Sequence, residues 1–285
     1  MKIAVFSDIH ANYIAFQKCL DYALGQGIDT FIFLGDYLGE FAYPQRTMDI
    51  IYALQEQYNC FFIRGNKEDY WINRKYDENC VWKNGNHTVG ALQYCYEHLT
   101  EQDISFFASL PVSREIRFEG AAPLLICHGS PNKNTEKLLP DDNNTKNIME
   151  GCAQQYILCG HTHRQFVMEY GGKRVINPGS VGVSLHGGGM AEFMILVQKG
   201  YEWEHEFVSL DYDREKVIRE LMECGLEVMA PYWCQVTKQL LRSGEVSHAT
   251  VLGRAMKLCY AELGECKWYS IPDKHWKNAI QELLG

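Results

Sequence analysis

Residues 3–10 read IAVFSDIH, a short apolar run that ends in a carboxylate and an imidazole. The same arrangement recurs in FIFLGD (31–36), CFFIRGN (60–66), LLICHG (124–129) and YILCGHTH (156–163). Short, continuous apolar runs of this kind are typical of strands that are buried on both faces of a sheet. We therefore predict five buried strands, at Ile3–Phe6, Phe31–Leu34, Cys60–Ile63, Leu124–Cys127 and Tyr156–Cys159.

Helical segments separate the first of these strands. Tyr13–Leu24 and Pro44–Gln57 have helical length and partly amphipathic spacing, and the second begins with a proline, which the first helical turn tolerates. Strands that alternate with helices indicate an α/β fold. Between Phe166 and Ser209 the pattern changes to strands separated by turns, which favours a second, more antiparallel sheet.

A change of pattern near residue 210 suggests two units. After Asp211 the strand pattern ends, and apolar residues such as Val217, Ile218 and Leu221 repeat at the three- and four-residue spacing of a helix face. We therefore predict an α/β domain over residues 1–210 and a helical extension over residues 211–285 that packs on it.

The composition is that of a protein with a packed core and an acidic surface. Apolar residues make up 46% of the 285 residues, and 36 acidic against 27 basic residues give a formal charge of −9. An acidic surface repels polyanions, which argues against a nucleic-acid polymer as partner. No apolar run approaches the roughly 20 residues that span a bilayer. We expect no membrane association and, from the scattered cysteines and the lack of a secretory signal, a cytoplasmic protein.

The five strand ends are where the chemistry is expected. The carboxyl ends of neighbouring parallel strands meet at one edge of a sheet, so residues far apart in sequence converge there. Carboxylate, carboxamide and imidazole donors suit Mn²⁺, Fe or Zn²⁺ and not a structural zinc site. The candidate ligands outnumber the needs of one ion and predict two: Asp8, His10, Asp36, Asn66, His128, His161 and His163.

The order of these motifs resembles that of the calcineurin-like metallophosphoesterase superfamily. The matching blocks are SDIH, GD at 35–36, GN at 65–66, HG at 128–129, GHTH at 160–163 and NPGS at 177–180. The resemblance covers about residues 1–210 and implies a two-sheet β-sandwich flanked by helices. It also implies that Asp8, His10, Asp36 and His163 hold one ion, and that Asp36, Asn66, His128 and His161 hold the other. Asp36 would then bridge two ions, Mn²⁺ or Fe with Zn²⁺ or Ni²⁺ as alternatives.

One block departs from the superfamily. Where its members usually read GNHD or GNHE, this chain has GNKE, which places Lys67 at the position of an imidazole. A lysine is a poor proton donor at neutral pH, although a fixed cation still stabilises a developing anion. We therefore hypothesise a preference for leaving groups that need no proton, such as phosphate or an aryl oxide. The alternative is that Lys67 is a solvated surface residue.

The residues around this block supply the remaining site predictions. Lys67, Asp36 and Glu68 are the candidate catalytic residues, and Arg164 and Asn66 are candidates for holding the substrate. The GNKE block and the helical extension together resemble a bacterial subgroup described as asymmetric dinucleoside tetraphosphate hydrolases and phosphodiesterases. In the extension, aromatic residues would either stack on a nucleobase or anchor helices and a dimer face: Trp233, Trp268, Tyr269 and Trp276.

The resulting functional hypothesis is hydrolysis of a phosphodiester or a nucleoside polyphosphate, by attack of a metal-bridging hydroxide on phosphorus. The expected substrate is a small phosphate compound such as a nucleotide. A homo-oligomer is a separate expectation, because the aromatic residues of the extension could form a dimer face. Three alternatives remain open at this point. They are a phosphomonoesterase or protein phosphatase, a non-catalytic scaffold on the same fold, and a nuclease, which the acidic charge disfavours.

Overall fold

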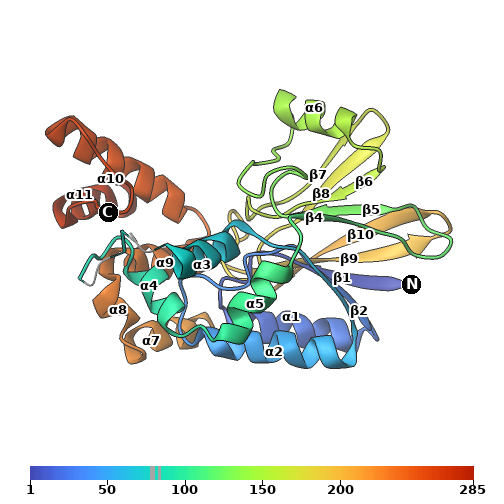
Figure 1. The fold of residues 1–285 in the computed structure, drawn as a ribbon, viewed down its shortest axis with the longest axis horizontal. Helices are drawn as coiled ribbons and strands as arrows, with labels where there is room; N and C mark the ends of the chain where they lie inside the picture. The colour runs from blue at the N-terminus through green and yellow to red at the C-terminus, as the bar shows by residue number, and fades with distance from the viewer. Residues whose placement is uncertain (78–80, 83–84) are drawn as a thin grey trace.

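The computed structural model describes residues 1–77, 81–82 and 85–285, and it contains two five-stranded sheets (Figure 1). The first sheet has the strand order β10 (Glu202–Leu210), β9 (Ala191–Lys199), β1 (Lys2–Phe6), β2 (Thr30–Phe33) and β3 (Asn59–Phe62). The second sheet has the order β4 (Ser113–Ile116), β5 (Leu124–Cys127), β6 (Tyr156–Leu158), β8 (Lys173–Pro178) and β7 (Gln165–Tyr170). The five strands predicted to be buried divide between the two sheets.

Parallel pairing brings the polar strand ends to one edge. Strands β1, β2 and β3 run parallel in the first sheet, and β5, β6 and β8 run parallel in the second. The prediction that residues 166–209 form a separate antiparallel sheet is wrong. Strands β9 and β10 pair with β1 in the first sheet, whereas β7 and β8 extend the second. A strand pattern in the sequence indicates a strand but does not specify its partner strand, because long-range packing decides the pairing.

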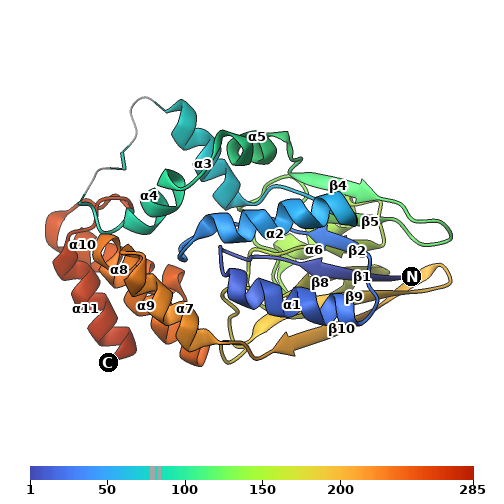
Figure 2. The ribbon, with the colours of Figure 1, turned by 90° about the horizontal axis from the view of Figure 1, so that it is seen from below.

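Helices cover the outer faces of both sheets. Helices α1 (Tyr13–Gly25), α2 (Pro44–Gln57) and α5 (Glu101–Ser109) lie against the first sheet, and α6 (Asn143–Gly151) lies on the second (Figures 1 and 2). Alternate residues of β1 serve the two sides: Phe6 packs in the cluster beneath the helices, and Val5 packs in the cluster between the sheets. This double burial explains why the strand is continuously apolar.

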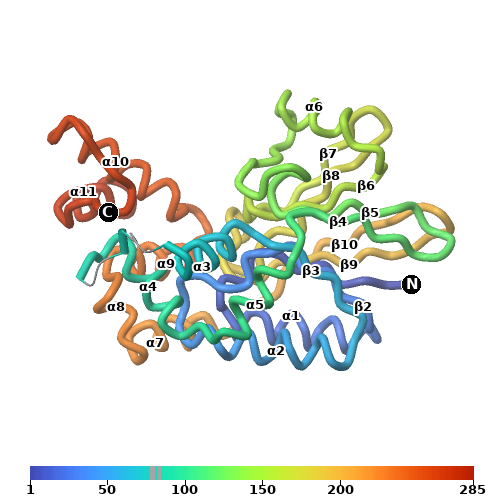
Figure 3. The backbone as a smooth tube through the Cα atoms, viewed as in Figure 1, coloured from blue at the N-terminus to red at the C-terminus, as the bar shows by residue number. Residues whose placement is uncertain are grey.

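Residues after 210 are helical and lie beyond the carboxyl ends of the parallel strands, at the opposite end of the molecule from the N-terminus (Figure 3). They form α7 (Arg214–Glu223), α8 (Leu226–Met229), α9 (Pro231–Ser243), α10 (His248–Leu263) and α11 (Asp273–Leu284). Helices α3 (Asn66–Tyr76) and α4 (Gly90–Glu97) lie beside them (Figure 1). Leu221 and Leu240 belong to the large core cluster, whereas Val251 and Trp276 belong to a second cluster within the extension.

Two further expectations concern the cysteines and membrane spans. Ten cysteines of the described residues are free thiols, and the eleventh, Cys80, lies outside those residues. In the part of the chain that the structure describes, no helix combines the length and the apolar character needed to cross a lipid bilayer.

Candidate metal centre

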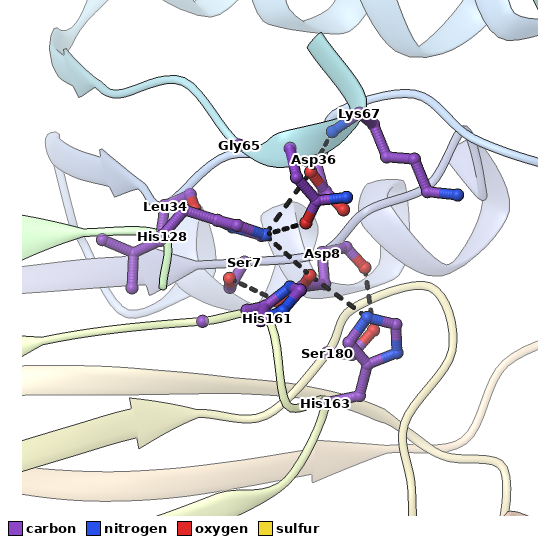
Figure 4. A network of polar contacts seen from close by, with 12 residues as sticks. Ser7, Asp8, Leu34, Asp36, Gly65, Lys67, His128, His161, His163 and Ser180 are labelled. Carbon is purple, nitrogen blue, oxygen red and sulfur yellow. Dashed lines mark hydrogen bonds and ion pairs between the residues drawn. The ribbon is translucent and has the colours of Figure 1, made fainter. Parts of the chain in front are cut away.

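The structure brings the seven candidate ligands together at the carboxyl edge of the two sheets. Figure 4 shows five of them: Asp8, Asp36, His128, His161 and His163. Asp8 and Asp36 follow β1 and β2, and Asn66 begins α3 directly after β3. His128 follows β5, and His161 and His163 follow β6. In Figure 4 the imidazoles from the second sheet point toward the carboxylates from the first. The site therefore lies where the two sheets meet.

Two groups of potential ligand atoms share Asp8, and within each group all atoms lie within 4.8 Å of one another. One group is Asp8, His10 and His163, and the other is Asp8, Asp36 and His128. Oδ1 of Asp8 is 3.2 Å from Nε2 of His163, and Oδ1 of Asp36 is 3.4 Å from Nε2 of His128. Oδ2 of Asp36 also lies 3.7 Å from Nε2 of His10. Both carboxylates thus reach each group, which suits two adjacent ions that share a ligand.

Asn66 and His161 lie at the margin of these groups. Oδ1 of Asn66 is 3.0 Å from Nε2 of His128, and the backbone N–H of His161 donates to Oδ2 of Asp8 at 2.9 Å. The His161 ring lies 5.1 Å from the His128 ring, measured between centroids. Both residues therefore border the atoms that the two groups present.

The backbone of the ligand residues is strained. Five of them have left-handed φ angles of 53–66°: Asp8, His10, Asp36, His161 and His163. Such angles are uncommon for residues other than glycine, and they persist only where the surrounding structure enforces them. The strained residues cluster at the strand ends. We infer that the surrounding fold enforces these backbone angles and thereby directs the side chains toward a common point.

Hydrogen bonding fixes which imidazole nitrogens are free. Nδ1 of His128 lies 2.7 Å from the carbonyl of Leu34, and Nδ1 of His163 lies 3.0 Å from the carbonyl of Val183. A carbonyl only accepts, so both Nδ1 atoms carry a proton, and Nε2 is the atom of each ring that faces the carboxylates; in a ring that binds a metal ion, Nε2 presents its lone pair there. The buried Oδ1 of Asp8 has no hydrogen-bond partner. A cluster of facing acceptors fits a bound cation.

The shifted pKa values in this cluster also indicate that the site favours positive charge. Burial lowers the pKa of His10, but the nearby carboxylates of Asp8 and Glu40 outweigh burial and raise it to about 10. Burial likewise lowers the pKa of His128, and the charges of Asp36 and Asp8 raise it more. For Asp8, burial raises the pKa, whereas His163 and His128 bring it well below its usual range. The Asp8 carboxylate therefore stays ionised and attracts a cation.

Glu40 is a site residue that sequence reasoning missed. Its Oε2 lies 3.2 Å from Nδ1 of His10, and its Oε1 pairs with the ammonium of Lys67. An outer carboxylate of this kind orients a ligating imidazole and fixes its tautomer. The available signal was the position of Glu40 four residues after Asp36, within GDYLGE.

Glu68, predicted as a catalytic residue, lies beneath the turn that carries Asp36. Its side chain is fully buried, and its carboxylate accepts hydrogen bonds from the backbone N–H groups of Asp36, Tyr37 and Gly65 at 2.8–3.0 Å. Burial, followed by the charge of Asp36, raises its pKa to about 7. Glu68 therefore holds the Asp36 turn against α3. Gly65 is required at this contact, because a Cβ there would lie 2.2 Å from Oδ1 of Asp36.

The NPGS segment positions ligands from both sheets. Asn177 donates to the carbonyl of Gly160 at 2.7 Å and to Oγ1 of Thr162 at 3.0 Å, which shapes the GHTH loop. Ser180 donates to the carbonyl of Asp8 at 2.8 Å. This motif thus acts through the backbone of the ligand loops.

Lys67 and Arg164 both line a cavity of about 770 Å³ that opens onto the ligands. The Lys67 side chain is only 14% exposed, so Lys67 is not the solvated surface residue of the alternative interpretation. Arg164 is exposed, and its guanidinium contacts Nε2 of His186. The C-terminal helices complete the cavity wall, with Trp233, His248 and Trp268 among the lining residues.

Comparison with known proteins identifies the family. A model described as the calcineurin-like phosphoesterase superfamily domain matches residues 1–199, and the chain belongs to this superfamily. An uncharacterised protein of Methanocaldococcus jannaschii, MJ0912, is 28% identical over 248 residues, which cover 81% of this chain and 94% of that protein. The chain is thus a metallophosphoesterase-family protein with a near full-length archaeal relative.

Two solved structures share the fold. The hypothetical protein PH1004 of Pyrococcus horikoshii OT3 has a TM-score of 0.72 and 20% identity, covering 86% of this chain and 99% of that one. A metallophosphoesterase of Sphaerobacter thermophilus has a TM-score of 0.65, also with 20% identity and coverage of 86% and 99%. The predicted fold, two sheets flanked by helices with a C-terminal helical extension, is confirmed.

Proposed function

We propose that this protein is a dinuclear metal-dependent phosphoesterase that hydrolyses phosphodiesters or nucleoside polyphosphates. The observation that carries the proposal is the buried Oδ1 of Asp8, which has no hydrogen-bond partner and lies 3.2 Å from Nε2 of His163. An acceptor so placed is stabilised by a cation, and membership of the calcineurin-like superfamily supports phosphate ester chemistry at that cation.

The proposed ligand sets are those that the family resemblance implies: Asp8, His10, Asp36 and His163 for one ion, and Asp36, Asn66, His128 and His161 for the other. Two compact groups of potential ligand atoms, Asp8 with His10 and His163 and Asp8 with Asp36 and His128, support the core of each set. Bound there, two Mn²⁺ or Fe ions, with Zn²⁺ or Ni²⁺ as alternatives, supply an activated water and neutralise charge on the phosphoryl group. Arg164 is placed on the cavity wall to bind phosphate oxygens through its planar guanidinium.

Lys67 supports a preference for leaving groups that need no proton. Burial lowers its pKa, but Glu40 and Asp36 raise it more, so the ammonium stays charged at neutral pH. A permanent cation stabilises a leaving oxyanion without protonating it. Phosphate released from a polyphosphate and aryl oxides leave in this way. The proposed relationship to the asymmetric dinucleoside tetraphosphate hydrolases and phosphodiesterases rests on this property.

The proposal is tested by loading the purified protein with Mn²⁺ or Fe and counting bound ions by elemental analysis. Hydrolysis of bis(4-nitrophenyl) phosphate and of 4-nitrophenyl phosphate is then compared. We expect two ions per chain and faster hydrolysis of the diester. Asp36→Asn should lose metal and reduce kcat by more than about 100-fold, the upper range for outer partners of metal ligands. Asp49→Asn, at an exposed position of α2, is the matched control.

Each other result has a definite meaning. Faster hydrolysis of the monoester favours a phosphomonoesterase or protein phosphatase. Two bound ions without turnover of any ester favour a scaffold. Unchanged turnover in Asp36→Asn overturns the proposed centre.

The proposal also places the protein in the cytoplasm. The ten free thiols among the described cysteines support this location, because such thiols persist in a reducing compartment.

A further inference from the structure

One wall of the cavity beside the candidate metal centre consists of residues that are not candidate metal ligands. This wall combines Tyr70 of α3 with residues of the C-terminal extension, including Trp268 in the loop between α10 and α11. We propose that Tyr70 and Trp268 form an aromatic subsite that binds a planar ring carried by the phosphoester substrate, such as a nucleobase. The inference rests on the proposed function for the phosphate part of the substrate, and it assigns the ring part.

Two other tryptophans of the extension pack against aromatic rings of the protein itself. Trp276 is 1% exposed and stacks on Tyr232 inside the core of the extension, with ring centroids 6.2 Å apart. The Trp233 ring is covered by His248, which stacks on it at 4.3 Å and 15°, and the Lys67 ammonium lies 6.0 Å from the same ring. Trp276 therefore has no face to offer a ligand, and one face of Trp233 is covered. Trp268 is half-buried and lines the cavity.

Tyr70 lies next to Trp268 and toward the metal ligands. The two ring centroids are 6.2 Å apart with an angle of 36° between the planes, and Tyr70 is 37% exposed. Tyr70 is four residues after Asn66 on α3, so the two side chains share one face of the helix, about one 5.4 Å turn apart. A ring joined to phosphorus through a short linker, such as a sugar, spans a distance of this order.

The loop that carries Trp268 is fixed against the catalytic part of the chain. Asn86 donates to the carbonyl of Tyr269 at 2.6 Å, and Thr88 donates to the carbonyl of Ile271 at 3.3 Å. The indole N–H of Trp276 donates to the same Thr88 hydroxyl at 2.9 Å. These bonds hold the Trp268 loop in place before a ligand arrives, which lowers the entropic cost of binding.

The cavity suits a ligand with one apolar planar end and one anionic end. Leu92, Leu139 and Leu252 line it together with the two aromatic rings, whereas Lys67 and Arg164 line it near the ligands. Stacking on an aromatic side chain does not depend on which base is present, because every base has a π face. The subsite therefore selects for a ring and not for one particular base.

The test compares AMP with ribose 5-phosphate as competitive inhibitors of the manganese-loaded protein, since the two differ only in the base. We expect AMP to bind more tightly. Trp268→Ala should raise the inhibition constant of AMP about tenfold and leave that of ribose 5-phosphate within twofold. Trp268→Phe should restore most of the AMP affinity. Phenyl phosphate tests whether any aryl ring is accepted, and a response parallel to that of AMP supports the same subsite.

A second readout does not require turnover. Saturation-transfer NMR with adenosine and the metal-free protein should show contact to the base protons, which Trp268→Ala and Tyr70→Ala should each weaken. Tyr70→Ala covers the case in which the tryptophan variant fails to fold. Tyr201→Ala, which removes an aromatic side chain that is 60% exposed in the turn between β9 and β10, is the control.

The outcomes separate the two proposals. If no phosphoester is hydrolysed but adenosine binding depends on Trp268, the proposed function fails and the aromatic subsite stands. If diesters are hydrolysed while AMP and ribose 5-phosphate bind equally, the subsite is wrong. Equal weakening of both inhibitors by Trp268→Ala would also overturn it, because the tryptophan would then support the fold and not the ring.

Discussion

Oε2 of Glu40 lies 3.2 Å from Nδ1 of His10, and the other oxygen of the same carboxylate pairs with Lys67. One buried carboxylate therefore contacts both a candidate metal ligand and the lysine of the GNKE block. Nε2 of His10 faces the carboxylates of Asp8 and Asp36, each 3.7 Å away. The position of Lys67 and the geometry of the metal centre are thus coupled through Glu40.

Replacement of Glu40 should weaken metal binding. Glu40→Gln removes the charge that fixes the tautomer of His10, and loss of such an outer partner lowers metal affinity by about 10–100-fold. Titration with Mn²⁺, followed by calorimetry, measures the change. Glu56→Gln, at an exposed site of α2, should leave the affinity unchanged. An affinity equal to wild type in Glu40→Gln would show that His10 is oriented without Glu40.

The Lys67 ammonium should make rates depend steeply on the leaving group. Without a proton donor, aryl phosphodiesters with more acidic phenols should react faster, because the departing oxyanion is stabilised only by charge. In Lys67→His, an imidazole able to donate a proton should flatten that dependence. The slope of log kcat/KM against phenol pKa checks this. Similar slopes in the two proteins would remove Lys67 from the leaving-group step.

Glu68→Ala should destabilise the folded protein and misplace Asp36. The substitution leaves three buried backbone N–H groups without their acceptor, at a cost of about 1–3 kcal/mol for each group that water cannot reach. Glu68→Gln keeps one acceptor oxygen and should lose less. Urea denaturation measures the free energy of unfolding, and the metal content reports the Asp36 turn. A purely catalytic role for Glu68 would leave both quantities unchanged.

Glu192 should make the stability fall as pH rises. Its side chain is 5% exposed, its Oε2 has no hydrogen-bond partner, and burial raises its pKa from 4.5 to about 7. The folded state therefore holds the proton more tightly than the unfolded chain. This contribution is present below pH 4.5 and is lost as the pH rises through 7, which amounts to about 3 kcal/mol.

The measurement is the free energy of unfolding of Glu192→Gln and wild type between pH 4.5 and pH 8. The variant should lack the part of the pH dependence that Glu192 supplies. Glu204→Gln, on the exposed side of β10, provides the matched control. Parallel pH profiles for Glu192→Gln and wild type would contradict the assignment.

Metal ions should stabilise the fold through Asp8. A ligand at about 100 times its dissociation constant adds about 2.7 kcal/mol of stability, which corresponds to a rise in Tm of several degrees for a chain of this size. Thermal unfolding with and without Mn²⁺ measures the shift, and a chelator should reverse it. Asp8→Asn should show little or no shift. A full shift in that variant would mean that the ions bind elsewhere.

Much of the fold follows from local pattern. The predicted helix Pro44–Gln57 and strand Leu124–Cys127 have the observed bounds, because a proline at the first turn and a short run of apolar residues constrain the backbone locally. The ligand positions could be predicted for a related reason. A polar residue directly after a buried parallel strand must lie at the carboxyl edge of its sheet, whatever the neighbouring strands are.

Only the folded chain shows which groups meet. Strands β7 to β10 follow one another as strands separated by turns, yet they join different sheets, since pairing depends on contacts between distant segments. Glu40 and Glu68 are ordinary acidic residues until the fold places one beside His10 and the other beneath Asp36. Tyr70 and Trp268 are 198 positions apart and become neighbours through helix packing. The local sequence pattern specifies which residues are buried and which backbone conformation they prefer. The contacts between distant segments depend on how well whole surfaces fit together in the folded chain.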